Sequence, residues 1–191
     1  MTHTNDFLVS PNPSDPRLTE RVVGIAHDGS RIETSVTVER PLTLYLNGRE
    51  IVTMMTIGDY PEYLALGYLL NQNMLSMDEE VLGVEYEEDI ETVVVRTATE
   101  TNFENKLKKK TLTSGCAQGT VFGDVMEKFV DAVLPKGTII KASWLYALTK
   151  QINTVPSLYL EAGAIHGCAL YEKNKPLLYM EDVGRHNAVD K

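Results

Sequence analysis

The chain is poor in cysteine, in tryptophan and in long apolar runs. Its 191 residues include two cysteines and one tryptophan. A secreted domain of this size usually carries several disulfide-bonded cysteines, so we expect a cytoplasmic protein with two free thiols. No run approaches the ~18 apolar residues of a membrane-spanning helix. The first 16 residues lack the basic and apolar regions of a signal peptide. The sequence therefore predicts neither membrane insertion nor secretion.

Basic residues are also scarce relative to acidic ones. The chain has 18 Lys and Arg against 27 Asp and Glu, which gives a formal net charge of −9. Nucleic acids and anionic membranes select basic surfaces, so we expect neither as a partner. Apolar residues make up 43% of the chain and charged residues 24%, as in folded globular proteins. The chain is long enough to bury a sizeable core.

Strands dominate the first part of the predicted fold. Alternating apolar and polar residues predict strands over 32–38 and 42–46. Asn47-Gly48 predicts a tight turn into a third strand over 51–56. Later segments mix helices with strands. They are a helix begun by Asp59 and Pro61 that ends near Asn73, a short helix from Ser76, strands over 81–86 and 92–97, a helix over 121–133, a helix capped by Ser143, and strands over 164–171 and 177–180.

This order of elements predicts an α/β (α+β) fold. A polar stretch over 99–113 predicts a hinge. We expect a flexible lead-in over 1–16, a β-rich N-terminal part with one helix over 17–110, and an α/β part over 111–191. Because the last residues predict the start of a helix, we expect that part to continue beyond Lys191.

Cys116 is the candidate nucleophile. It lies in a loop between Gly115 and Gly119, just ahead of the predicted helix over 121–133. A helix N-terminus favours a thiolate and lowers the thiol pKa, as a nucleophilic or sulfur-carrying cysteine requires. The alternative is a cysteine that only occupies a turn. Cys168 lies in a predicted apolar strand, where a small buried hydrophobic role is expected.

A polar cluster follows the last predicted strand, over residues 181–187. Carboxylates, a guanidinium, an imidazole and an amide at a strand's carboxyl end suit a ligand site. Gly184 would let a ligand approach the backbone, and Arg185 could clamp a phosphate. Asp182 or Asn187 could read a ribose or a base edge, with His186 beside them. The alternative is a solvated loop that caps the next helix. Metal-ligand spacings are absent from the sequence, so we expect no metal site.

Several segments together resemble one known family. They are Glu39–Leu42, Tyr63–Leu69, the loop around Cys116, Gly163–His166 and, above all, Glu181–Lys191. With these segments the chain resembles the FdhD family of formate dehydrogenase accessory sulfurtransferases, from about residue 20 to the end. The resemblance implies a cytidine-deaminase-like α/β/α layered domain without the zinc site, and a homodimer.

The resemblance also implies a function, that of a cytoplasmic sulfur carrier. Such a protein takes sulfur from a cysteine desulfurase as a cysteine persulfide, here on Cys116. It passes the sulfur to the bis-molybdopterin guanine dinucleotide (molybdenum) cofactor before the cofactor enters formate dehydrogenase. The site for the cofactor or its guanine nucleotide would include residues of the final motif. These are Asp182, Gly184, Arg185, His186 and Asn187.

The sequence departs from the family in two ways. Many members carry a CxxC motif in the cysteine loop, whereas Gly119 stands three positions after Cys116, so a single persulfide must suffice. Members also continue past the final Asp-Lys, and part of their cofactor site lies there. Two other functions stay open. One is a cofactor-binding chaperone of formate dehydrogenase that moves no sulfur. The other is a nucleotide deaminase, for which the ligands of an activated water are missing.

Overall fold

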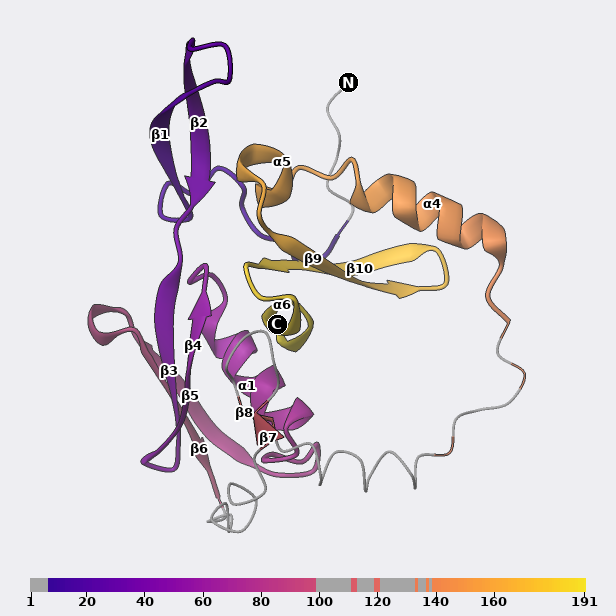
Figure 1. Cartoon of the computed structure of the whole chain (residues 1–191). Coiled ribbons are helices and arrows are strands. Elements are labelled where there is room, and N and C mark those ends of the chain that lie inside the picture. The colour runs from indigo at the N-terminus through magenta and orange to yellow at the C-terminus, as the bar shows by residue number, and fades with distance from the viewer. Residues whose placement is uncertain (1–6, 99–110, 113–118, 121–132, 134–136, 138) are drawn as a thin grey trace. The chain divides into compact units, whose positions relative to one another are not determined.

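The computed structural model describes residues 7–98, 111–112, 119–120, 133, 137 and 139–191. The chain divides into two compact units (Figure 1). The first unit comprises Met1–Glu39 and Lys136–Ala188, and the second comprises Arg40–Pro135 and Val189–Lys191. Each unit combines strands with helices, so the predicted α+β class is confirmed. The predicted domain boundary at residue 110 adjoins the segment 99–110, outside the described residues, and stays a prediction.

The second unit is built on a mixed four-stranded sheet in the order β4-β3-β6-β5. The strands are β3 (Arg40–Leu46), β4 (Arg49–Thr56), β5 (Val81–Glu87) and β6 (Thr92–Thr97), with the 3₁₀ turn η1 (Glu88–Ile90) between the last two. β3 and β6 run parallel, and the outer pairs are antiparallel. At the β3–β4 turn, Asn47 and Gly48 both have positive φ, the backbone that an Asn-Gly hairpin turn requires. The predicted hairpin is confirmed.

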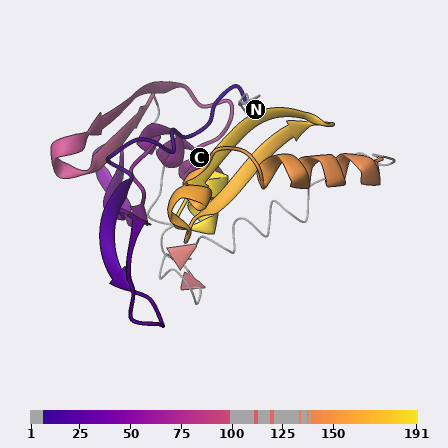
Figure 2. The same cartoon turned by 90° about the horizontal axis from the view of Figure 1, so that it is seen from above.

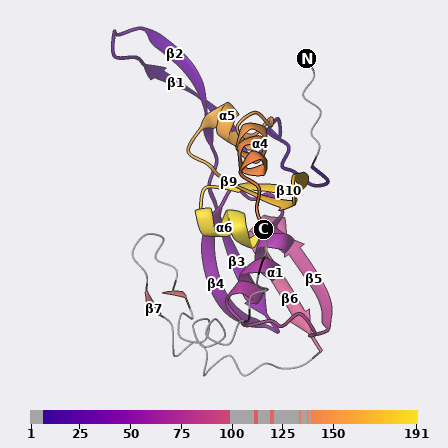
Figure 3. The ribbon, with the colours of Figure 1, turned by 90° about the vertical axis from the view of Figure 1, so that its right-hand side faces the viewer.

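Helix α1 (Pro61–Asn71) covers one face of this sheet (Figure 3). Alternate residues of β3 point toward it, and Leu42, Leu44 and Leu46 are each at most 1% exposed. The predicted inward positions of the helix, Leu64, Tyr68 and Leu69, are confirmed as buried. Two further strands belong to this unit, β7 (Thr111–Leu112) and β8 (Gly119–Thr120), and they pair antiparallel with each other.

The first unit contains two antiparallel hairpins. One is β1 (Thr19–Ile25) with β2 (Arg31–Thr37), and the other is β9 (His166–Glu172) with β10 (Lys175–Asp182). Helix α4 (Ala142–Ile152) lies along the second hairpin (Figure 2), and α5 (Leu158–Ala162) packs against β2. α6 (Arg185–Asp190) follows β10 and continues into the second unit.

A small aromatic cluster forms the core beside β10. Phe7 packs against Tyr171 and Tyr179, with ring centroids 5.6 and 5.5 Å apart. The chain after Phe7 runs next to β10, where the Leu8 amide donates to the Leu177 carbonyl and the Tyr179 amide donates to the Val9 carbonyl. Residues 7–9, which fall in the predicted lead-in, are therefore bonded to a strand.

Three sequence-based details are wrong. No helix forms from Ser76, because its hydroxyl donates to the Asp78 carboxylate and residues 72–80 form turns and bends. Asp59 does not cap α1. Tyr60 occupies that position in a left-handed conformation, with no side-chain cap. Ser143 lies inside α4, whose N-cap is Lys141. The predicted helix over 121–133 falls almost wholly outside the described residues.

Candidate functional site

The candidate site lies at the junction of β10 and α6, where the polar cluster 181–187 was predicted. Glu181 and Asp182 end the strand and are both 0% exposed. Arg185 begins the helix, and the Ala188 amide donates to the Gly184 carbonyl at 3.0 Å. The cluster therefore comprises the last two residues of β10, the turn that follows and the start of α6, all within one compact unit.

The Glu181 carboxylate points toward the start of α5. Its Oε2 accepts from the Leu158 amide at 2.8 Å, and its Oε1 accepts from the Tyr159 amide at 3.2 Å. Oε1 also accepts from the Tyr179 hydroxyl at 3.0 Å. Burial and the Glu181 charge raise the pKa of that tyrosine, so its proton stays in the hydrogen bond. Backbone N–H groups at a helix start need acceptors, and Glu181 supplies them from another element.

Asp182 organises the turn itself. Its Oδ1 accepts from the Gly184 amide at 3.0 Å and from the Asn187 side-chain amide at 3.1 Å. Asn187 is 4% exposed, and a Cβ on Gly184 would lie 3.1 Å from its amide group. The turn is therefore tightly packed around a bonded Asp182–Asn187 pair, and Gly184 leaves room for that pair.

Arg185 and His186 are the exposed members of the cluster. They lie on the first turn of α6, directly after the packed Gly184 backbone. Among the five predicted ligand-binding residues, these two present a guanidinium and an imidazole to solvent. Asp182 and Asn187 are turned inward.

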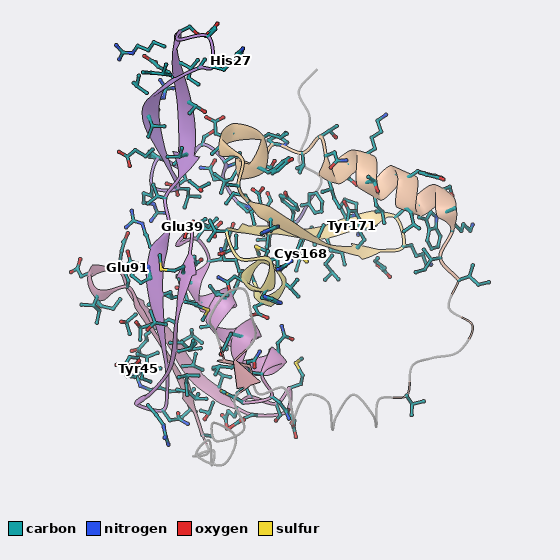
Figure 4. All side chains as sticks on the ribbon, in the orientation of Figure 1. His27, Glu39, Tyr45, Glu91, Cys168 and Tyr171 are labelled. Carbon is teal, nitrogen blue, oxygen red and sulfur yellow. The ribbon has the colours of Figure 1, made fainter. Side chains whose placement is uncertain are left out.

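The two cysteines differ in how far the structure describes them. Cys168 lies on β9 opposite Met180 (Figure 4), is half-buried, and has a thiol pKa raised by that burial. Cys116 lies outside the described residues. Among the described residues, the nearest to it in the sequence are Leu112 and Gly119, which pair with each other between β7 and β8.

A second polar cluster joins α1 to the end of α6. Asn71 Nδ2 donates to Asp190 Oδ1 at 2.6 Å. The Lys191 ammonium is fully buried and forms an ion pair with Asp59. Sequence reasoning did not link these residues. Their only signal was that the α1 segment and the final motif both belonged to the family resemblance, and a local pattern cannot show contact between them.

The described ranges contain no candidate metal site and no candidate membrane-spanning helix. There, no three His, Cys, Asp or Glu side chains come close enough together to hold a metal ion. Among the helices formed by those same residues, none is long and apolar enough to cross a membrane.

Comparison with known proteins decides the family. The model of the FdhD/NarQ family matches residues 37–191. The chain belongs to the FdhD/NarQ family. Among the FdhD/NarQ relatives are proteins named "Sulfur carrier protein FdhD". The one from Wolinella succinogenes is 29% identical over 163 residues, which cover 83% of this chain and 56% of that protein. The one from Bacillus subtilis is 28% identical and is matched over 85% and 62%.

A solved structure confirms the FdhD/NarQ fold. It is that of a formate dehydrogenase accessory protein from Desulfotalea psychrophila, with a TM-score of 0.62 and 22% identity. The match covers 90% of this chain and 64% of that one. The chain thus spans 56% to 62% of the length of the two curated FdhD relatives named above. The family predicted from the motifs is confirmed.

Proposed function

We propose that this chain acts as a sulfur carrier in the maturation of formate dehydrogenase. The observation that carries this proposal is its membership of the FdhD/NarQ family, whose matched relatives are named sulfur carrier proteins. The proposed sulfur donor is a cysteine desulfurase, and the recipient is the bis-molybdopterin guanine dinucleotide cofactor as a bound substrate. The proposed setting is the cytoplasm, with the protein as a homodimer and without a resident metal.

Cys116 is the proposed sulfur-carrying residue. The chain has two thiols. Cys168 is half-buried, which limits the access of a donor protein to its thiol. The same burial raises the pKa of the Cys168 thiol and so reduces its thiolate fraction. The Cys116 thiolate attacks the terminal sulfur of the donor persulfide. A new S–S bond forms on Cys116 while the donor S–S bond breaks and the donor cysteine leaves as a thiolate.

The turn after β10 is the proposed contact for the guanine nucleotide of the cofactor. Arg185 and His186 are exposed there, and a guanidinium suits bidentate contact with phosphate oxygens. Asp182 and Asn187 contribute by holding the turn, since their side chains bond to each other. Gly184 contributes its small size, because its neighbour Asn187 fills the adjacent space.

Complementation tests this function. A strain that lacks its own FdhD is given the wild type, Cys116→Ser or Cys168→Ser, and its formate dehydrogenase activity is measured. We expect Cys116→Ser to abolish maturation and Cys168→Ser to preserve it. Full maturation by Cys116→Ser would refute the sulfur-carrier proposal and favour a chaperone that holds the cofactor without moving sulfur. Equal protein levels on an immunoblot make the strains comparable.

A further inference from the structure

The first turn of α6 cannot be stable by itself. The helix has six residues, Arg185–Asp190, whereas isolated helices shorter than about 12–15 residues are marginal in water. The exposed side chains of Arg185 and His186 therefore depend on contacts elsewhere in the chain for a fixed direction. At the start of the helix, the hydrogen bond from Asn187 to Asp182 on β10 supplies such a contact.

The end of α6 is fixed on helix α1. The side-chain amide of Asn71 bonds the Asp190 carboxylate, and the buried Lys191 ammonium pairs with Asp59 just before α1. Both contacts join residues more than a hundred positions apart in the sequence. A buried charge without a partner is strongly unfavourable, and Asp59 supplies an opposite charge for Lys191 at this position.

Gly67 makes the close approach possible. A Cβ built on Gly67 would overlap the carbonyl oxygen and carbon of Asp190. Those atoms belong to the backbone and cannot rotate away as a side chain can. The backbone of Asp190, the last residue of α6, therefore occupies the space that a side chain at position 67 would fill. Alanine would otherwise be the better helix former at this position, by about 1 kcal/mol.

We infer that Asp59, Gly67 and Asn71 are positioning residues for the nucleotide site. By fixing the last turn of α6 they keep the short helix folded, and so they keep Arg185 and His186 on an ordered first turn. They do this without contact with the ligand. This inference rests on the proposed function in one respect, namely that the turn binds the guanine nucleotide.

Gly67→Ala is the direct test, with Gly83→Ala as its control. Gly83 lies in the same unit, and an added Cβ there would meet nothing within 4 Å. Asn71→Ala is a milder variant at an exposed residue, in case Gly67→Ala fails to fold. Two quantities are measured on each protein. One is the exchange rate of the Ala188 amide without nucleotide, and the other is the Kd for GDP.

We expect Gly67→Ala to accelerate exchange at Ala188 about tenfold or more, because the α6 helix opens locally. The Thr43 amide, which bonds Glu91 O in the sheet, should exchange as in the wild type. The Kd for GDP should rise about fivefold or more. Asn71→Ala should shift both in the same direction by less, and Gly83→Ala should shift neither.

Two results would overturn the inference. One is unchanged exchange at Ala188 in both α1 variants. The other is faster exchange with a wild-type Kd for GDP, since an ordered α6 would then not matter to the ligand. A wild type that binds no GDP would instead refute the proposed nucleotide site. The two failures are distinguishable because exchange is measured without GDP.

Discussion

Replacing Glu181 by glutamine should destabilise the protein far more than a surface substitution does. The two carboxylate oxygens accept three hydrogen bonds, at 2.8, 3.2 and 3.0 Å, from two backbone amides and one hydroxyl. A glutamine has one acceptor oxygen and an NH₂ group in place of the other. At least one backbone N–H of α5 would then face a donor and lose its partner in a site that is 0% exposed.

The magnitude follows from the bonds that are lost. A hydrogen bond to a charged group contributes about 1.5–3 kcal/mol, and a buried donor left without an acceptor adds its own desolvation cost. We expect Glu181→Gln to lower the free energy of unfolding by about 2–4 kcal/mol. That is a large fraction of the total stability of a typical domain, about 5–15 kcal/mol.

Urea unfolding followed by tryptophan fluorescence measures this loss. Trp144 is the single tryptophan and lies on α4, in the same unit as Glu181. Glu172→Gln is the matched control, because it makes the same chemical change at an exposed end of the β9–β10 hairpin. It should change stability by no more than about 0.5 kcal/mol. If the two variants unfold at the same urea concentration, Glu181 is not the acceptor that holds α5.

Three further substitutions test other parts of the structure. Among the described residues the buried Tyr68 hydroxyl has no hydrogen-bond partner, so Tyr68→Phe should raise the free energy of unfolding by up to about 1 kcal/mol. Burial and the Asp190 charge raise the pKa of Tyr68 to about 12 from 10.0. The folded state therefore favours the protonated form of Tyr68. The contribution of this preference to the stability of the wild type is complete below pH 10 and is lost as the pH rises toward 12. Absorbance titration should accordingly find one late-titrating tyrosine fewer in Tyr68→Phe than in the wild type. Gly167→Ala would place a methyl group 2.5 Å from the Tyr179 hydroxyl and should lower the unfolding free energy by about 1–3 kcal/mol, as seen in urea melts. Arg185→Ala should weaken GDP binding by about 1.5–3 kcal/mol in calorimetry, and equal binding by both proteins would place the nucleotide elsewhere.

Local periodicity was sufficient to predict most elements of the sheet. The alternation in 42–46 and the Asn47-Gly48 turn predicted the β3–β4 hairpin because side-chain direction in a strand follows a period of two. The strand β1 was not predicted. Its Val22-Val23-Gly24 run does not alternate, and it forms a strand by pairing with β2, from Thr19 opposite Thr37 to Ile25 opposite Arg31.

The position of the polar cluster in the fold could be predicted, but not which of its side chains are buried. Residues 181–187 lie together because they are consecutive, and their polar composition marked them. Which side chains turn inward depends on elements far away in the sequence. The Glu181 carboxylate is held in a buried position because it accepts a hydrogen bond from the backbone amide of Leu158, the first residue of α5. Asp59 was expected as a helix cap, but its partner is Lys191, 132 positions away, and no local signal shows that contact.

Persulfide mapping identifies the cysteine that carries sulfur. The wild type, Cys116→Ser and Cys168→Ser are incubated with a cysteine desulfurase and cysteine, and their peptides are analysed by mass spectrometry under non-reducing conditions. We expect a mass gain of one sulfur atom on the peptide with Cys116, in the wild type and in Cys168→Ser. We expect no gain in Cys116→Ser. A gain on Cys168, or no gain in any of the three proteins, would contradict the assignment of Cys116 as the sulfur carrier.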